Sequence, residues 1–132
     1  MNSAPLRPLW RRSRATILRM RNDPLRIEDQ PANGAGSRVL RLSGPLVLNN
    51  VFAFQSTIRE DTSQSLILDF TNVPYVDSAG IGALVGAYVT RQNSGRNLAL
   101  VGVIARIHDS LKVTGVEKFF KFFDSVEAAQ LA

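Results

Sequence analysis

Residues 66–84 read LILDFTNVPYVDSAGIGAL, and this stretch decides the fold class. Its first five residues form a nearly continuous apolar run, which is typical of a strand covered on both faces. After a turn that contains Pro74, apolar residues recur at helical spacing from Ile81 to Val89. A buried strand followed by a helix predicts an α/β fold in which the next strand runs parallel to the first.

The rest of the chain continues this alternation. Two short alternating segments, 25–28 and 38–42, predict edge-type strands joined by a loop. The further elements that the pattern predicts are a helix over 50–61 begun by Asn49 or Asn50, a strand over 97–103, a helix over 104–114, a strand-like piece over 119–123 and a terminal helix over 124–131. Asp124 and Glu127 have the spacing of a capping box for the last helix. We therefore expect a mixed, mainly parallel sheet flanked by helices.

The composition limits the chemistry of the chain. It has 132 residues, of which 45% are hydrophobic and 20% charged, and this suits one globular domain. The absence of cysteine excludes disulfides, cysteine-based zinc sites, iron–sulfur clusters and a cysteine nucleophile, and His108 is the only histidine. No serine lies in a Gly-x-Ser-x-Gly elbow. We expect neither an enzyme nor a cofactor or metal site.

The net charge of +5 comes from the first 23 residues, which hold six arginines and one acidic residue. We predict a basic, disordered leader over 1–23 and an electrically neutral domain over 24–132. A reading frame that truly starts at Met20 is an equivalent interpretation. An organelle transit peptide, a membrane-surface anchor or a nucleic-acid arm is the alternative. A neutral domain gives no reason to expect a direct nucleic-acid partner.

The sequence also bears on location. No segment approaches the roughly 18 to 20 consecutive apolar residues that a membrane span needs, so we expect a soluble protein without a membrane span. The lack of cysteine fits a reducing cytoplasm.

Small residues follow the turn that contains Pro74. Gly80, Gly82 and Gly86 resemble a degenerate dinucleotide fingerprint, but they begin several residues beyond the strand, and the next strand ends without the acidic residue that would hold a ribose. We interpret the small residues as a flank that permits close backbone approach; its members are Ala79, Gly82, Ala83, Gly86 and Ala87. The element that approaches is either the domain's own sheet or a helix of another protein.

Ser78 lies at the predicted start of the helix. As an N-cap, its hydroxyl would accept a hydrogen bond from an amide of the first turn, and this is a sufficient structural reason for a serine there. The same place favours a phosphate, because free helix amides and the helix dipole stabilise negative charge. Both interpretations, an N-cap and a phosphorylation site, are open on spacing alone.

The run over 66–84 resembles the signature of STAS domains, specifically that of bacterial anti-sigma factor antagonists. The similarity extends from about Leu25 to Ala132 and includes the order of elements and the closing FFDSVEAA at 122–129. The resemblance implies a sheet of four or five strands flanked by helices and no intrinsic catalysis.

It also implies a partner-switching cycle that regulates transcription. The unphosphorylated protein would bind an anti-sigma factor that is also a serine kinase, and this would free the sigma factor. The kinase would phosphorylate Ser78, and a phosphatase would reset it. By the same resemblance, the residues that flank the phosphorylation site or form the docking surface are Asp77, Ala79, Gly80, Ile81 and Gly82.

Two positions depart from the family pattern. Many members carry an acidic residue in a Gly-x-Leu-Asp loop before the first helix, where this chain has Val47. Ala79 stands where serine or threonine is common. These departures favour an alternative hypothesis, in which the protein is a non-switching STAS scaffold subunit of a signalling or lipid-transport complex.

Overall fold

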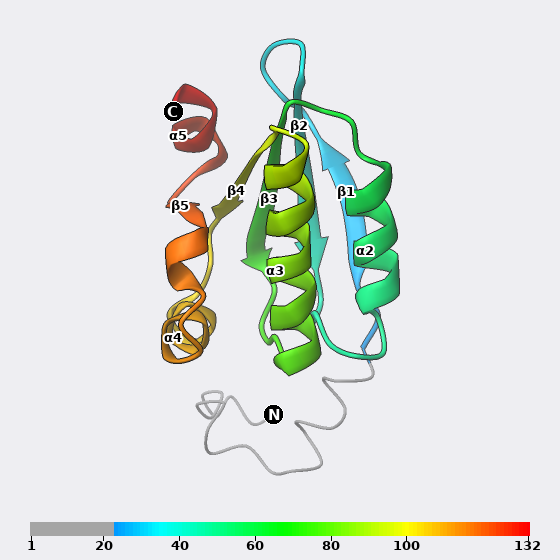
Figure 1. Ribbon diagram of the computed structural model, residues 1–132, viewed down its shortest axis with the longest axis vertical. Helices are drawn as coiled ribbons and strands as arrows, with labels where there is room; N and C mark the ends of the chain where they lie inside the picture. The colour runs from blue at the N-terminus through cyan, green and yellow to red at the C-terminus, as the bar shows by residue number, and fades with distance from the viewer. Residues whose placement is uncertain (1–22) are drawn as a thin grey trace, which may run out of the picture.

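The computed structural model describes residues 23–132 (Figure 1). The strands form one sheet in the order β1-β2-β3-β4-β5, in which β1 and β2 are antiparallel and the other neighbours are parallel. Their bounds are β1 Arg26–Gln30, β2 Ser37–Ser43, β3 Ser65–Asn72, β4 Asn97–Val101 and β5 Lys121–Phe123. The predicted mixed, mainly parallel sheet is confirmed.

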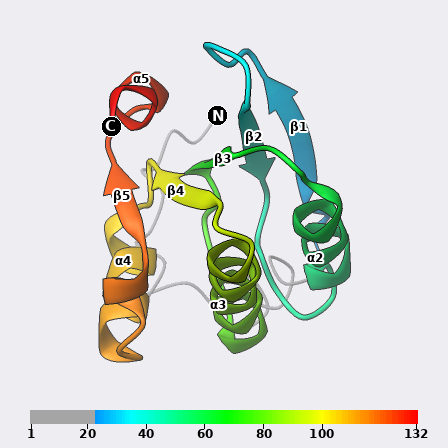
Figure 2. The same cartoon turned by 45° about the horizontal axis from the view of Figure 1, so that its top comes forward.

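The helices pack on both faces of this sheet. They are α2 Val51–Glu60, α3 Ser78–Asn93, α4 Ala105–Val113, the short 3-10 helix η2 Glu117–Phe119 and α5 Val126–Leu131. Helices α2, α3 and α4 supply buried residues to the main core on one face. Helix α5 packs against a smaller core on the other face, formed by Val39, Ile67 and Val101, and Figure 2 shows it apart from the other three helices.

Strand β3 is the centre of the sheet. All five residues of the run from Leu66 to Phe70 are buried, including the polar residue Asp69. Leu66 and Leu68 point into the main core, whereas Ile67 points into the smaller core. The run therefore lacks polar alternation because both faces of the strand are covered, as the sequence predicts.

Strand β2 corrects one prediction. The alternating segment 38–42 predicted an edge strand, but β2 lies between β1 and β3. The connection through α2 brings β3 alongside β2 in parallel, so Leu40 and Leu42 are buried beneath the helices and only β1 remains at this edge. The local sequence pattern of a strand does not show which strand pairs with it in parallel through a crossover connection, so the position of β2 could not be predicted.

Other predictions need smaller corrections. The strand-like piece over 119–123 divides into η2 and β5, and the strand over 97–103 ends at Val101. The cap of α5 is Ser125, whose hydroxyl accepts a hydrogen bond from the amide of Ala128 at 3.1 Å, rather than Asp124. The predicted leader falls outside the described residues apart from Asp23. Within residues 23–132, no helix is both long and apolar enough to cross a membrane.

Candidate functional site

Ser78 is the first residue of α3, and it is exposed. The helix is capped by the preceding residue, because Oδ1 of Asp77 accepts a hydrogen bond from the amide of Gly80 at 2.9 Å. The prediction that Ser78 is the N-cap is therefore wrong by one residue. Among the described residues, its hydroxyl group has no hydrogen-bond partner.

The loop before α2 explains why Asp77 is the cap. Oδ2 of Asp77 accepts a hydrogen bond from the amide of Leu48 at 3.2 Å, and the amide of Asp77 donates to the carbonyl of Leu46 at 3.3 Å. The amide of Leu46 in turn donates to the carbonyl of Tyr75 at 3.0 Å. One carboxylate thus satisfies a helix amide and a loop amide with its two oxygens, and it ties the two loops together.

Gly80 belongs to the support of the site. It is buried, and a Cβ at this position would collide with the carbonyl oxygen of Leu46 and with the side chain of Val76. The absence of a side chain therefore lets α3 begin directly against the loop before α2. Gly80 sets the position of Ser78 rather than contributing to the outer surface.

An open groove of about 660 Å³ lies beside Ser78, between the start of α3 and the end of α4. Ala79 and Ile81 are half-buried in its wall, and Gly82 lies exposed one turn beyond Ser78. Two strongly exposed apolar side chains border the groove, Leu48 with 63% and Val113 with 87% of its surface accessible. Single exposed apolar residues are common on protein surfaces, whereas contiguous apolar area is typical of interaction sites.

The groove carries acidic groups as well. Asp77 and Asp109 both line it, whereas no arginine or lysine from residues 23–132 does. A further negative charge placed on Ser78 would therefore meet like charges across a partly apolar surface.

Val47 lies beneath this surface. Its side chain is 1% exposed, and its amide donates a hydrogen bond to Oδ1 of Asn50 at 2.9 Å. Asn50 also donates from its side-chain amide to the carbonyl of Pro45 at 2.8 Å, so it orders the loop and makes no side-chain cap for α2. The residue that replaces the acidic group is thus part of the core, and position 47 presents no charge to the groove.

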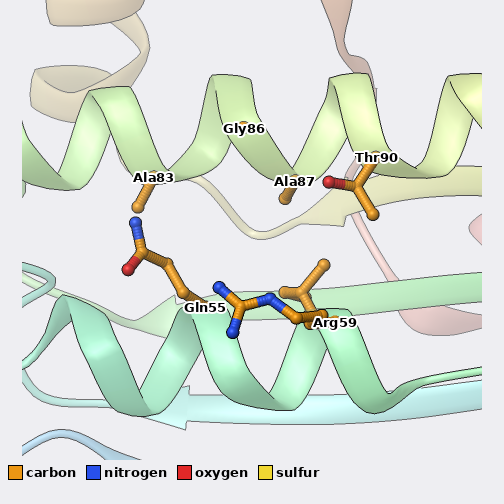
Figure 3. Close-up of a pocket in the computed structure, with 7 residues that line it drawn as sticks. Gln55, Arg59, Ala83, Gly86, Ala87 and Thr90 are labelled. Atoms are coloured by element: carbon orange, nitrogen blue, oxygen red, sulfur yellow. The ribbon is translucent and has the colours of Figure 1, made fainter.

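The small-residue flank of α3 faces another helix of the same domain. Ala83 and Ala87 are buried against α2 (Figure 3). Gly82 and Gly86 have no neighbour within reach of a Cβ. A shallow hollow of about 140 Å³ remains between the helices at Gly86. The element that approaches Ala83 and Ala87 is therefore α2, an assignment that sequence reasoning did not make, whereas Ala79 lines the groove and Gly82 is exposed.

The last turn of α3 carries a buried ion pair. Arg91 and Asp61 are each 2% exposed at their side chains and lie 2.7 Å apart. Arg91 also donates to the carbonyls of Ser63 and Asn97 at 2.9 and 2.8 Å. Arg38 contacts the other oxygen of Asp61 at 3.1 Å. Every polar group of Arg91 is thus engaged in holding α3 to the start of β3 and β4.

The two buried aspartates of the described domain, Asp61 and Asp69, have lowered pKa values. Burial by itself raises the pKa of Asp61, but hydrogen bonds from Ser63 and Arg38 and the charges of Arg91 and Arg38 outweigh it, so the net direction is downward. At Asp69, burial is likewise outweighed by hydrogen bonds from the hydroxyl and amide of Thr71 and from Arg41. Both groups are ionised and paired in the folded protein.

Sequence reasoning found Ser78 and its neighbours but missed Leu48 and Val113. Leu48 follows a Pro-containing loop, and Val113 occupies a polar stretch near the end of α4, so neither stands out by spacing. Only the fold brings these side chains to the same groove. Within residues 23–132, no group of His, Asp and Glu side chains could hold a metal ion.

The sequence of residues 27–129 matches the family model of the STAS domain. The chain belongs to the STAS domain family. The matched segment begins inside β1 and ends inside α5, so it includes the whole sheet, the groove and Ser78.

Several known proteins resemble this chain in sequence or in fold. The chain is 24% identical to the anti-sigma F factor antagonist of Paenibacillus polymyxa over 94 residues, which are 68% of this chain and 80% of that protein. The structure of an anti-sigma factor antagonist from Mycobacterium paratuberculosis superposes with a TM-score of 0.70 at 18% identity, covering 81% of this chain and 92% of the other. The murine Solute Carrier 26 family member A9 anion transporter gives a TM-score of 0.69 at 23% identity, over 89% of this chain and 23% of the transporter.

Proposed function

We propose that this STAS protein is an anti-sigma factor antagonist, a binding protein without catalysis or cofactor that acts in the cytoplasm. The name of the Paenibacillus relative, which is similar along most of its length, supports this role. In the proposed cycle, the protein binds an anti-sigma factor that is also a serine kinase, and sigma-factor-dependent transcription follows. A phosphatase restores the binding form after phosphorylation.

The groove beside Ser78 is the proposed docking surface. Leu48, Val113 and Ile81 supply apolar area that a partner would remove from water, at a gain of roughly 25 cal/mol for each Å² buried. Gly82 leaves space beside them for close approach of a partner's backbone. Asp77 and Gly80 hold the first turn of α3 in place, and Ala79 completes the wall.

Phosphorylation of Ser78 is the proposed off switch. The observation that carries it is the exposed hydroxyl at the first position of α3, with no hydrogen-bond partner in the described part of the chain. A phosphate would add about −1.5 to −2 charge units. Free helix amides tolerate that charge in the unbound protein, but in a complex it would lie beside Asp77 and Asp109 on a desolvated surface, so binding would weaken.

A second candidate function is the non-switching scaffold subunit of a signalling or lipid-transport complex. The buried Val47 favours it, because the loop beside the groove lacks the acidic residue common in the family. The occurrence of the same fold within a much longer transporter chain is consistent with it.

Affinity capture from a lysate of the host separates the two functions. Wild type, Ser78→Ala and Ser78→Asp are used as baits, with and without ATP, and bound proteins and phosphate at Ser78 are identified by mass spectrometry. A switch predicts a kinase-like partner that is lost with ATP or with Ser78→Asp, together with phosphate on Ser78. The same partners on every bait, without phosphate, would establish the scaffold function instead.

A further inference from the structure

A second surface lies along the later turns of α3, where Tyr88 contacts Phe119 of the short helix η2. The rings of Tyr88 and Phe119 stack with centroids 5.3 Å apart and an interplanar angle of 24°. Phe119 keeps 38% of its surface exposed. Aromatic area is thus exposed away from the residues that line the Ser78 groove.

Three cationic side chains surround these rings. The Nζ atom of Lys118 lies 5.7 Å from the centroid of Phe119. Arg96 and Lys121 line a small hollow together with Phe119. We call Tyr88, Phe119, Arg96, Lys118 and Lys121 the basic aromatic surface.

The cations of this surface form no ion pairs within residues 23–132. Arg38, Arg41 and Arg91 each contact an aspartate within 3.3 Å, whereas Arg96, Lys118 and Lys121 contact no carboxylate there. Other cations of the domain, such as Arg59 and Arg106, are also without an ion pair among the described residues. The basic aromatic surface is distinguished because its three cations lie around one partly exposed ring.

We propose that the basic aromatic surface docks an acidic segment of a partner protein. Carboxylates of the segment would pair with Arg96, Lys118 and Lys121, and an apolar side chain would pack against the part of Phe119 that Tyr88 and Lys118 leave exposed. An acidic segment is favoured as the occupant because its negative charges complement the three cations of the surface. Lysine and arginine at the edge of an exposed ring are well placed to bind carboxylates, and the ring supplies the apolar contact that fixes the register.

The geometry argues against other occupants. The hollow between α3 and η2 measures about 50 Å³, whereas small-molecule sites occupy roughly 300 to 1,000 Å³. A nucleic acid would need an aromatic face free for base stacking, but Phe119 already has Tyr88 stacked on it and an ammonium group over its ring. An extended acidic peptide needs neither a cavity nor a free ring face.

The two surfaces of α3 are separate. Tyr88 follows Ser78 by ten residues, which is about 15 Å along a helix at 1.5 Å per residue. An acidic segment on the basic aromatic surface would therefore leave the Ser78 groove open, and the proposal holds whether or not Ser78 is a phosphorylation site.

Fluorescence anisotropy with a labelled peptide tests the proposal on the full chain. The probe is a twelve-residue peptide of glutamate and aspartate with one central leucine, and the matched probe replaces the acidic residues by glutamine. The test variant is Lys118→Glu with Lys121→Glu. The control variant is Arg106→Glu with Lys112→Glu on α4, which changes the net charge equally and keeps the arginine-rich first 23 residues.

We expect the acidic probe to bind wild type with an affinity that falls as salt rises, and the glutamine probe not to bind. The test variant should lose roughly tenfold in affinity, and the control variant less than threefold. Phe119→Ala should weaken the leucine-containing probe but leave a probe without leucine unchanged.

Three results would overturn the proposal. Equal losses in the two double variants would mean that net charge or the first 23 residues bind the probe. Failure of the acidic probe to bind wild type at millimolar concentration would show that the basic aromatic surface does not dock acidic segments. A single-stranded oligonucleotide that binds more tightly than the peptide, and that the test variant releases, would assign the surface to nucleic acid. Circular dichroism of each variant checks that it is folded.

Discussion

The two ends of α3 are built in opposite ways. At its last turn, Arg91 is buried and its guanidinium pairs with Asp61 and with two backbone carbonyls. At its first turn, Ser78 is exposed beside an open groove bordered by Leu48 and Val113. One end therefore fixes the helix to the sheet, and the other end presents side chains at a surface. The buried end therefore stabilises the fold, and the exposed end is where the proposed binding would take place.

The largest expected effect comes from breaking the buried end. Arg91→Met removes one partner of an ion pair that is 2% exposed on both sides, so Asp61 is left buried and less well compensated. Loss of one partner of such a pair costs about 3 to 5 kcal/mol of unfolding free energy. Urea denaturation measures it, and Arg59→Met on the exposed face of α2 is the control. A loss below about 1 kcal/mol would show that the buried pair is not the anchor of α3.

The second effect concerns the approach of α3 to the loop before α2. Gly80→Ala should destabilise by about 1 to 3 kcal/mol, because its Cβ would collide with the carbonyl of Leu46. Gly86→Ala is the matched change in the same helix, at a position with no neighbour within 4 Å. It should stabilise by about 0.5 to 1 kcal/mol, since alanine favours a helix over glycine. Equal responses in urea denaturation would contradict the close contact.

The third effect isolates the cap. Asp77→Ala removes the acceptor for the amides of Gly80 and Leu48, and we expect it to cost about 0.5 to 2 kcal/mol. Asp77→Asn keeps one side-chain oxygen as a cap and should cost less. Denaturation midpoints of the two variants compare them. If both variants match wild type, the cap does not hold the exposed end in place.

The smallest effect is a pH dependence. Because the pKa of Asp69 is lowered in the folded state, its contribution is complete above the unfolded value of about 3.9 and is lost as pH falls through the lower folded value. The difference in unfolding free energy between wild type and Asp69→Asn should therefore shrink as pH falls from 6 toward 2.5. A constant difference over this range would mean that the paired carboxylate does not contribute through its charge.

These comparisons show which features could be predicted from sequence. The apolar run at β3 and the helical spacing from Ile81 are local patterns, so they predicted the central strand, α3 and the position of Ser78. The cap of α3 was missed because Asp77 and Ser78 are both good capping residues. The choice between them depends on the amide of Leu48, which is 29 residues from Asp77 in the chain.

Long-range partners explain the other omissions. Arg91 and Asp61 are 30 residues apart, and each lies in a polar sequence environment that predicts an exposed side chain. Val113 is strongly exposed and has polar residues on either side, so the local sequence does not mark it as part of a site. It lies at the Ser78 groove because α4 packs beside the start of α3. Packing between elements, rather than the pattern within them, decides these positions.

The central claim is that a negative charge at the exposed end of α3 controls binding. Its most direct test is isothermal titration of the purified anti-sigma factor that wild type captures, against Ser78→Ala, Ser78→Asp and Ser56→Asp, the last being an exposed serine on α2. We predict that Ser78→Asp binds at least tenfold more weakly than wild type, whereas Ser78→Ala and Ser56→Asp stay within threefold. Binding of Ser78→Asp as tight as that of wild type would contradict the account.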